Sequence, residues 1–201
     1  MRAAERGFQH GFQIIELVVC LAVMSVLLSL AAPSLMEMSG NRRVHLAAQE
    51  LQGTLRLARA WAVRYSANVA VKFDEDEQGF VTFGLYRDAD GDGVLNRDIK
   101  SGVDPEMAQP RRLLHLGSFV KFGFPPDRRV RDPGSPSHYL NTRDPIRFNE
   151  SDLASFGPLG TSTPGSLYVT DGKSRLAAVR VFGRTGKVKI LTYDFEEEVW
   201  K

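Results

Sequence analysis

The sequence has few cysteines and little net charge. It contains one cysteine, Cys20, so no internal disulfide can support the fold. Its 26 lysines and arginines nearly balance 24 aspartates and glutamates, and a net charge of +2 gives no general field for nucleic acid. With 43% hydrophobic and 25% charged residues, the composition is that of a globular protein and excludes a wholly disordered chain.

Common enzyme motifs are also missing. The sequence has no G-x-S-x-G, no H-E-x-x-H and no phosphate-binding P-loop. Its histidines have no metal-ligand spacing, and they are His10, His45, His115 and His138. We therefore expect no enzyme, no catalytic residues and no small-molecule substrate.

One long apolar run is present, from Phe12 to Ala32, and Glu16 is its only charged residue. As a helix it would span roughly 31 Å, enough to cross a bilayer core. A secretory signal peptide cut near Ala31 is the alternative, but its apolar core is usually only about 7–15 residues long. A carboxylate inside such a run raises the cost of insertion and indicates a function. The sequence thus predicts a transmembrane helix over residues 12–33.

The residues around this run resemble the leader junction of type IV pilins and pseudopilins. The matching stretch is Gly11-Phe12-Gln13-Ile14-Ile15-Glu16-Leu17, followed by Pro33. The resemblance implies that a prepilin peptidase cuts after Gly11, which makes residues 1–11 a leader peptide, and that Phe12 is then N-methylated. Glu16 becomes the fifth mature residue. Gln13 and Ile14 depart from the commoner Thr and Leu.

Simple electrostatics supports a role for Glu16 in assembly. Cleavage would create an ammonium at Phe12, and an ion pair at 4 Å gains about 4 kcal/mol at an effective dielectric of 20. The resemblance implies that Glu16 meets the ammonium of a neighbouring subunit, so other pilins or pseudopilins are the expected partners. A pair within one chain, or a protonated Glu16, is the alternative.

A helical pattern continues after Pro33. Apolar residues recur at steps of four and three, which predicts the amphipathic half of one long helix over residues 34–66. Pro33 is expected to kink this helix. The predicted buried stripe is Val44, Ala48, Leu51, Leu55, Ala58, Ala62 and Tyr65.

Residues 67–201 read as a β-rich domain, which gives an α+β fold with a pilin-like long helix packed on an antiparallel β-sheet. Alternating patterns predict strands at 68–74, 80–86, 119–124, 146–148, 167–170, 176–182 and 188–193. The turn 183–186 is expected to join the last two as a hairpin, and the proline-rich stretch 125–145 is expected to be a mobile loop. We expect the strands to follow one another as a meander.

An acidic stretch in this domain resembles the first half of an EF-hand loop. Its predicted calcium ligands are Asp88, Asp90, Asp92, Val94, Asn96 and Asp98. Ile99 stands where the usual bidentate Glu would be, and the motif follows a strand with no helix-loop-helix context. An acidic solvated turn, without a cofactor, is the alternative.

Two basic clusters raise a second binding hypothesis, DNA capture of the kind seen in FimT-type minor pilins. Their residues are Arg128, Arg129, Arg131, Arg180, Arg184, Lys187 and Lys189. Glu196, Glu197 and Glu198 make the tail acidic, and we expect no aromatic residues to interleave with the arginines for stacking.

The C-terminal pattern is similar to the GspH/FimT branch of the superfamily, from Gly165-Ser166-Leu167-Tyr168 to Gly186-Lys187-Val188. The resemblance implies a structural minor subunit of a type II secretion pseudopilus or a type IV pilus that helps initiate assembly. Arg2 and Arg6 favour a cytoplasmic N-terminus. Arg42 and Arg43 near the other end of the apolar run weaken this charge argument. The resemblance, more than the charges, implies a single-pass inner-membrane protein with a periplasmic C-terminal domain.

Overall fold

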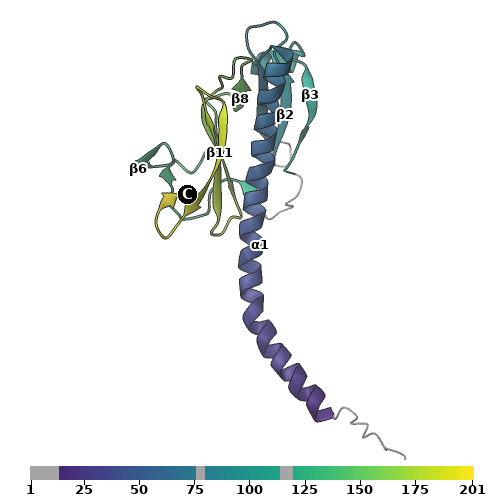
Figure 1. Ribbon diagram of the computed structural model, residues 1–201. Coiled ribbons are helices and arrows are strands. Elements are labelled where there is room, and N and C mark those ends of the chain that lie inside the picture. Colours follow the sequence, from purple (N-terminus) through teal and green to yellow (C-terminus); the bar gives the residue numbers. More distant parts are fainter. Residues whose placement is uncertain (1–13, 76–79, 114–119) are drawn as a thin grey trace, which may run out of the picture. The chain divides into compact units, whose positions relative to one another are not determined.

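A computed structural model describes residues 14–75, 80–113 and 120–201, with only the backbone of residues 30–41. The chain divides into two units, residues 1–39 and 40–201. Helix α1 (Ile14–Tyr65) contributes to both (Figure 1). The predicted leader, the Gly11–Phe12 junction and the side chain of Pro33 lie outside the described residues. Among the residues that are described, no helix is both long and apolar enough to cross a membrane.

The second part of α1 buries the predicted stripe. Val44, Ala48, Leu51, Leu55 and the two alanines Ala58 and Ala62 are all at most 2% exposed. The prediction was wrong at Tyr65, which is 42% exposed at the last position of the helix. Ala47 and Thr54 are also buried and widen the stripe. Because so many of these residues are small, strands can approach the helix axis closely.

Within the described residues, the first sheet has four strands in the order β3-β2-β1-β8. They are β1 (Val69–Glu75), β2 (Val81–Arg87), β3 (Glu106–Arg111) and β8 (Leu153–Phe156). The hairpin of β1 and β2 was expected from the sequence. The return of β8 to pair with β1 was not, so the strands do not form a simple meander.

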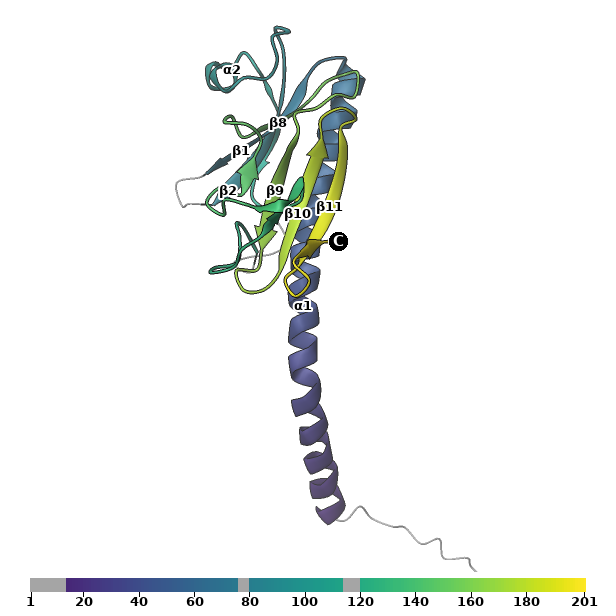
Figure 2. The same cartoon turned by 90° about the vertical axis from the view of Figure 1, so that its left-hand side faces the viewer.

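The second sheet has the order β12-β11-β10-β9-β4, and β7 also pairs with β9. Its long strands are β9 (Gly165–Thr170), β10 (Leu176–Phe182) and β11 (Lys187–Asp194), which lie side by side in Figure 2. Its short strands are β4 (Lys121–Phe122), β7 (Ile146–Arg147) and β12 (Val199–Trp200). The expected hairpin turn joins β10 to β11, with the amide of Gly186 donating to the carbonyl of Phe182 at 2.8 Å.

The main core lies between α1 and the inner faces of both sheets. It joins Leu51 and Leu55 to Phe73 and Phe83 of the first sheet and to Val179 of the second. A second apolar cluster lies on the other face of the second sheet and contains Tyr168, Leu176 and Tyr193. Both faces of the second sheet are therefore partly covered.

The proline-rich stretch 125–145 was predicted to be a loop, and this is wrong for part of it. It contains a hairpin of β5 (Arg131–Asp132) and β6 (Ser135–Tyr139). Val130 before it is fully buried in the second cluster. Distant residues contact the hairpin, and local sequence patterns do not reveal such contacts.

Candidate functional site

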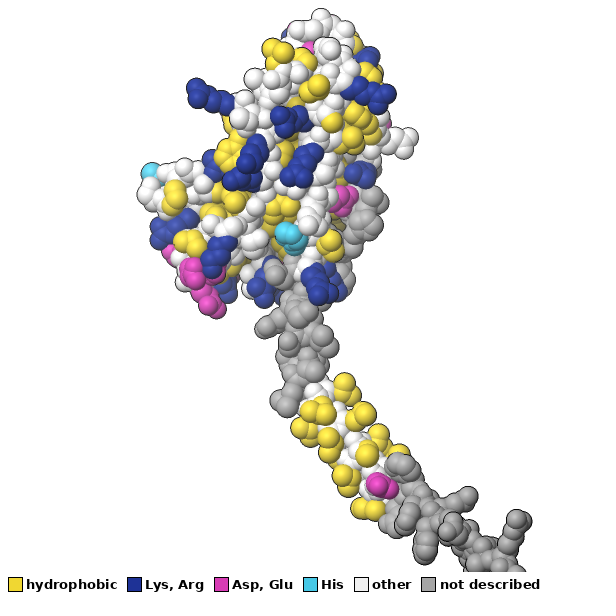
Figure 3. Space-filling view, viewed as in Figure 1, with side chains coloured by type: hydrophobic (Ala, Val, Ile, Leu, Met, Phe, Trp, Pro, Cys, Tyr) yellow, Lys and Arg dark blue, Asp and Glu magenta, His cyan; other side chains and the backbone are white. Residues whose placement is uncertain are grey.

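Glu16 lies in the first turn of α1, where a carboxylate interacts favourably with the helix dipole. The surrounding side chains are apolar and exposed, as for Leu17 (56%) and Val18 (53%). Figure 3 shows hydrophobic side chains covering this part of the helix together with one acidic side chain, and Glu16 is the only acid in residues 14–29. An acid thus stands alone on an apolar surface.

The acidic loop after β2 is built around Asp88, which is only 5% exposed. Its Oδ1 accepts the amide of Gly91 at 2.7 Å, and its Oδ2 accepts the amide of Gly93 at 3.0 Å and Nδ2 of Asn68 at 2.8 Å. Burial alone would raise the pKa of Asp88, but these hydrogen bonds outweigh it and lower that pKa. Gly91 and Gly93 both have positive φ angles, which glycine adopts readily and which this tight turn requires.

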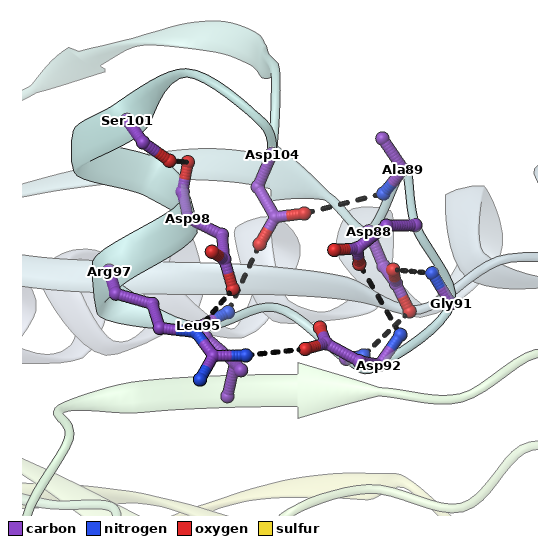
Figure 4. A network of polar contacts seen from close by, with 11 residues as sticks. Asp88, Ala89, Gly91, Asp92, Leu95, Arg97, Asp98, Ser101 and Asp104 are labelled. Atoms are coloured by element: carbon purple, nitrogen blue, oxygen red, sulfur yellow. Dashed lines mark hydrogen bonds and ion pairs between the residues drawn. The ribbon is translucent and has the colours of Figure 1, made fainter.

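Asp104 closes the same loop from the other side and was missed in the sequence. It is 1% exposed, and its carboxylate accepts the amides of Ala89 at 3.3 Å and Leu95 at 3.1 Å (Figure 4). Val94 is buried against Ala70 and Leu153. Asp104 comes after the end of the motif and precedes a proline, and nothing in this local sequence indicates that its carboxylate returns to the loop.

The remaining predicted ligands lie at the exposed side of the loop. Arg97 bridges two of them, with Nη2 2.6 Å from Oδ2 of Asp92 and Nε 3.1 Å from Oδ2 of Asp98. Desolvation and then the carboxylate of Asp90 raise the pKa of Asp92. In the part of the chain that the structure describes, carboxylate oxygens of three residues lie within 4.8 Å of one another in two groups, Asp88, Asp90 and Asp104, and Asp90, Asp92 and Asp98.

Asn96 begins a short helix, α2 (Asn96–Ser101), that the sequence reading did not expect. Its Nδ2 donates to the carbonyl of Ser151 at 3.1 Å. Its Oδ1 is buried without a hydrogen-bond partner among the described residues. The motif therefore follows a strand, and its last residues form the start of a short helix, an arrangement that differs from both the full EF-hand and the plain turn.

The first basic cluster is tied to aromatic and acidic neighbours. The guanidinium of Arg128 lies 4.9 Å from the ring centre of Phe195, and that of Arg129 lies 5.7 Å from that of Tyr139. Nη2 of Arg131 pairs with Oε2 of Glu198 at 2.7 Å. The expectation that aromatic residues do not accompany the arginines was wrong, because folding brings Phe195 and Tyr139 to them from elsewhere in the chain.

The second basic cluster lies on β10, β11 and their turn. Arg180 and Lys189 are cross-strand partners, while Arg184 lies in the turn and Lys187 begins β11. Figure 3 shows basic side chains spread over the face on which β11 lies, with an acidic group near the C-terminal turn. The two clusters lie on different structural elements of the second unit.

A long helix whose small-residue stripe packs on antiparallel sheets is the architecture of a pilin-like protein. The comparison with protein families is consistent with this class, because a family described as Type II transport protein GspH matches residues 47–185. The chain belongs to the GspH family. The protein is therefore a GspH/FimT-type minor pseudopilin, and its family implies a structural, pseudopilin-like role in type II secretion. Searches of curated proteins and of solved structures gave no match.

Proposed function

We propose that this protein is a minor subunit of a type II secretion pseudopilus that helps initiate its assembly. In this proposal prepilin peptidase removes residues 1–11, Phe12 is methylated, and residues 12–33 hold the chain in the inner membrane before assembly. The domain after them lies in the periplasm. The family match supports assignment to a type II secretion system. Type IV pili are built from similar subunits, so a type IV pilus is the alternative assembly.

The observation that carries the proposal is the position of Glu16. It is the only acid on the described apolar surface of residues 14–29, and it stands four residues after the expected new N-terminus. An unpaired carboxylate is costly in an apolar surrounding, and an ammonium from an adjacent subunit removes that cost. Growth of the filament would therefore neutralise both charges at once.

The test is Glu16→Ala in the full chain. We expect the variant to be inserted and cleaved as usual, because the cleavage junction is intact, but to be lost from purified filaments. Ser25→Ala is the control, since Ser25 is exposed elsewhere on the same part of α1 and its hydroxyl donates to the carbonyl of Ala22. Normal incorporation of Glu16→Ala would contradict the assembly role. Mass spectrometry showing an intact start, or cleavage near Ala31, would contradict the processing.

We also propose that the acidic loop binds calcium. The support is the clustering of carboxylate oxygens of Asp90, Asp92 and Asp98 within 4.8 Å, since hard cations prefer several oxygen ligands. In this proposal a cation adds to the bracing that Arg97 supplies. DNA capture has less support, because Arg131 is already paired with Glu198.

A further inference from the structure

Three cations and one serine form a continuous row across the second sheet. Arg147 on β7 lies opposite Ser166 on β9, Ser166 lies opposite Arg180 on β10, and Arg180 lies opposite Lys189 on β11. The neighbours of these residues along each strand, Leu167, Val179 and Val188, point into the main core against α1. The row therefore occupies the face of the sheet that is turned away from α1.

Such a row is unfavourable by itself. Neighbouring strands are about 4.8 Å apart, and like charges placed opposite each other destabilise an antiparallel pair. No ion pair within the described part of the chain includes any of the three cations. Arg180 and Lys189 lie against the ring of Phe182, at 5.3 and 6.0 Å from its centre. An aromatic face relieves only part of the repulsion, so an added negative charge is favoured here.

A pocket of about 230 Å³ opens at this row. Its base includes Ser166 and Tyr168, which are 8% and 1% exposed. Half-buried Arg147 and Arg180 line it from the two flanking strands, and Asp132 reaches it from the β5–β6 hairpin. Beneath this base, β9 passes close to residues 147–148 on the core side, because a Cβ on Gly165 would lie 2.3 Å from Cδ1 of Phe148 and 2.4 Å from the carbonyl oxygen of Arg147. These residues form a built concavity rather than a loose surface cluster.

The charges of the pocket select an anion. Two guanidinium groups face one carboxylate, and the phenol of Tyr168 stays neutral because burial, the largest cause, raises its pKa to about 12. Arginine forks match the two oxygens of a carboxylate, and the Ser166 hydroxyl offers another donor. A cavity of this size holds one small group. A long phosphate backbone crossing the same face would meet Asp132 and, beyond Arg131, Glu198.

We propose that the pocket between Arg147 and Arg180 binds a carboxylate, and that this carboxylate is an acidic side chain of a neighbouring subunit. The choice of neighbour rests on the filament function proposed above, whereas the preference for a carboxylate does not. The pocket would then fix the identity or the orientation of one adjacent subunit by charge.

The first test uses the full chain, purified in detergent and labelled with 15N for NMR. The probe is the capped peptide acetyl-Ala-Glu-Ala-amide, and acetyl-Ala-Gln-Ala-amide is its neutral match. We expect saturable shifts of the Gly165, Ser166 and Arg180 amides with the Glu peptide only. Arg180→Gln and Arg147→Gln should each weaken binding by about fivefold or more, because one arginine fork is lost.

Arg184→Gln is the matched control, since it removes the same charge from the same hairpin but does not line the pocket. Unchanged binding in that variant supports the pocket, and equal weakening in both overturns it in favour of a diffuse charge effect. Arg180→Lys keeps the charge without the fork and should bind between wild type and Arg180→Gln, with a normal spectrum that confirms folding. Shifts at the row with a single-stranded oligonucleotide but not with the Glu peptide would also overturn the proposal.

The second test concerns the source of the carboxylate. We expect Arg180→Gln to lower incorporation into filaments and Arg184→Gln to leave it unchanged. If Arg180→Gln loses the peptide but incorporates normally, the neighbouring subunit is excluded as the source. If the wild-type chain is absent from purified filaments while the peptide still binds, the filament function fails and the carboxylate pocket stands.

Discussion

The indole Nε1–H of Trp200 donates a hydrogen bond of 2.6 Å to the carbonyl oxygen of Arg131. Residue 200 is thereby joined to a hairpin 69 positions earlier in the chain. Nε and Nη2 of the same Arg131 bind Oε2 of Glu198 at 3.1 and 2.7 Å, and its amide donates to the hydroxyl of Tyr193 at 3.2 Å. The C-terminal strand pair thus holds the hairpin that carries Asp132 into the pocket.

Trp200→Phe should loosen that hairpin. The variant keeps most of the ring contacts with Tyr168 and Tyr193 but removes the donor to Arg131, at a cost of about 0.5–1.5 kcal/mol in stability. Hydrogen exchange should become faster at the amides of 131–140. Trp61→Phe, on α1, is the control and should leave exchange in the hairpin unchanged. Unaltered exchange in Trp200→Phe would show that the hydrogen bond does not hold the hairpin.

Two glycine substitutions should have opposite signs. Gly165→Ala places a Cβ 2.3 Å from the ring of Phe148 and should destabilise the protein by about 1–3 kcal/mol through overpacking. Gly53→Ala meets nothing within 4 Å on α1 and should stabilise it by about 0.5–1 kcal/mol, because alanine loses less entropy in a helix. Denaturant unfolding measures both. A stabilising Gly165→Ala would show that β9 does not pass residues 147–148 as closely as described.

Acid should weaken the C-terminal turn through Asp194. A bond from Lys201, then the amides of Glu197 and Glu196, lower the pKa of Asp194 to about 2. Because this folded value lies below the ordinary value of 3.8, the stabilisation is present above about pH 4 and is lost as the pH falls towards 2. The melting temperature of Asp194→Asn should therefore fall less steeply than that of wild type over this range. Glu150→Gln, an exposed acid elsewhere, is the charge-matched control, and parallel curves for wild type and Asp194→Asn would contradict the assignment.

Calcium should release or absorb heat when titrated into the full chain in detergent. Asp90→Ala and Asp92→Ala should remove this signal, since each takes away an exposed oxygen ligand without touching the hydrogen bonds of Asp88 and Asp104. Glu150→Gln serves again as a control outside the loop. Absence of heat at millimolar calcium in wild type would end the proposal and leave an acidic turn braced by Arg97.

The sequence predicts those parts of this fold that depend on neighbouring residues. The stripe through Leu51 and Leu55 and the hairpin of β10 and β11 follow from local periodicity and a short glycine-containing turn. The sequence does not predict contacts whose partners are far away in the chain. Asp104 closes a loop that begins at Asp88, and the β5–β6 hairpin is held by Glu198 and Trp200, so the prolines around it wrongly suggested a loop there.

The basic row shows the same limit for the site. Arg180 and Lys189 were grouped because they lie close in the sequence, but Arg147 joins them only through the pairing of β7 with β9. Charge counts along the chain identify basic clusters. Only the strand register reveals which members of a cluster share one concavity.

The pairing of β1 with β8 also has a consequence during synthesis. Val69 pairs with Phe156, so the first sheet lacks its last strand until residue 156 has been made. At about 5–20 residues per second, a ribosome needs roughly 4–16 s to go from the end of β1 to that point. During this interval the apolar faces of β1 and β2 have no complete sheet to join. Those unpaired strands are therefore exposed to aggregation for as long as this interval lasts.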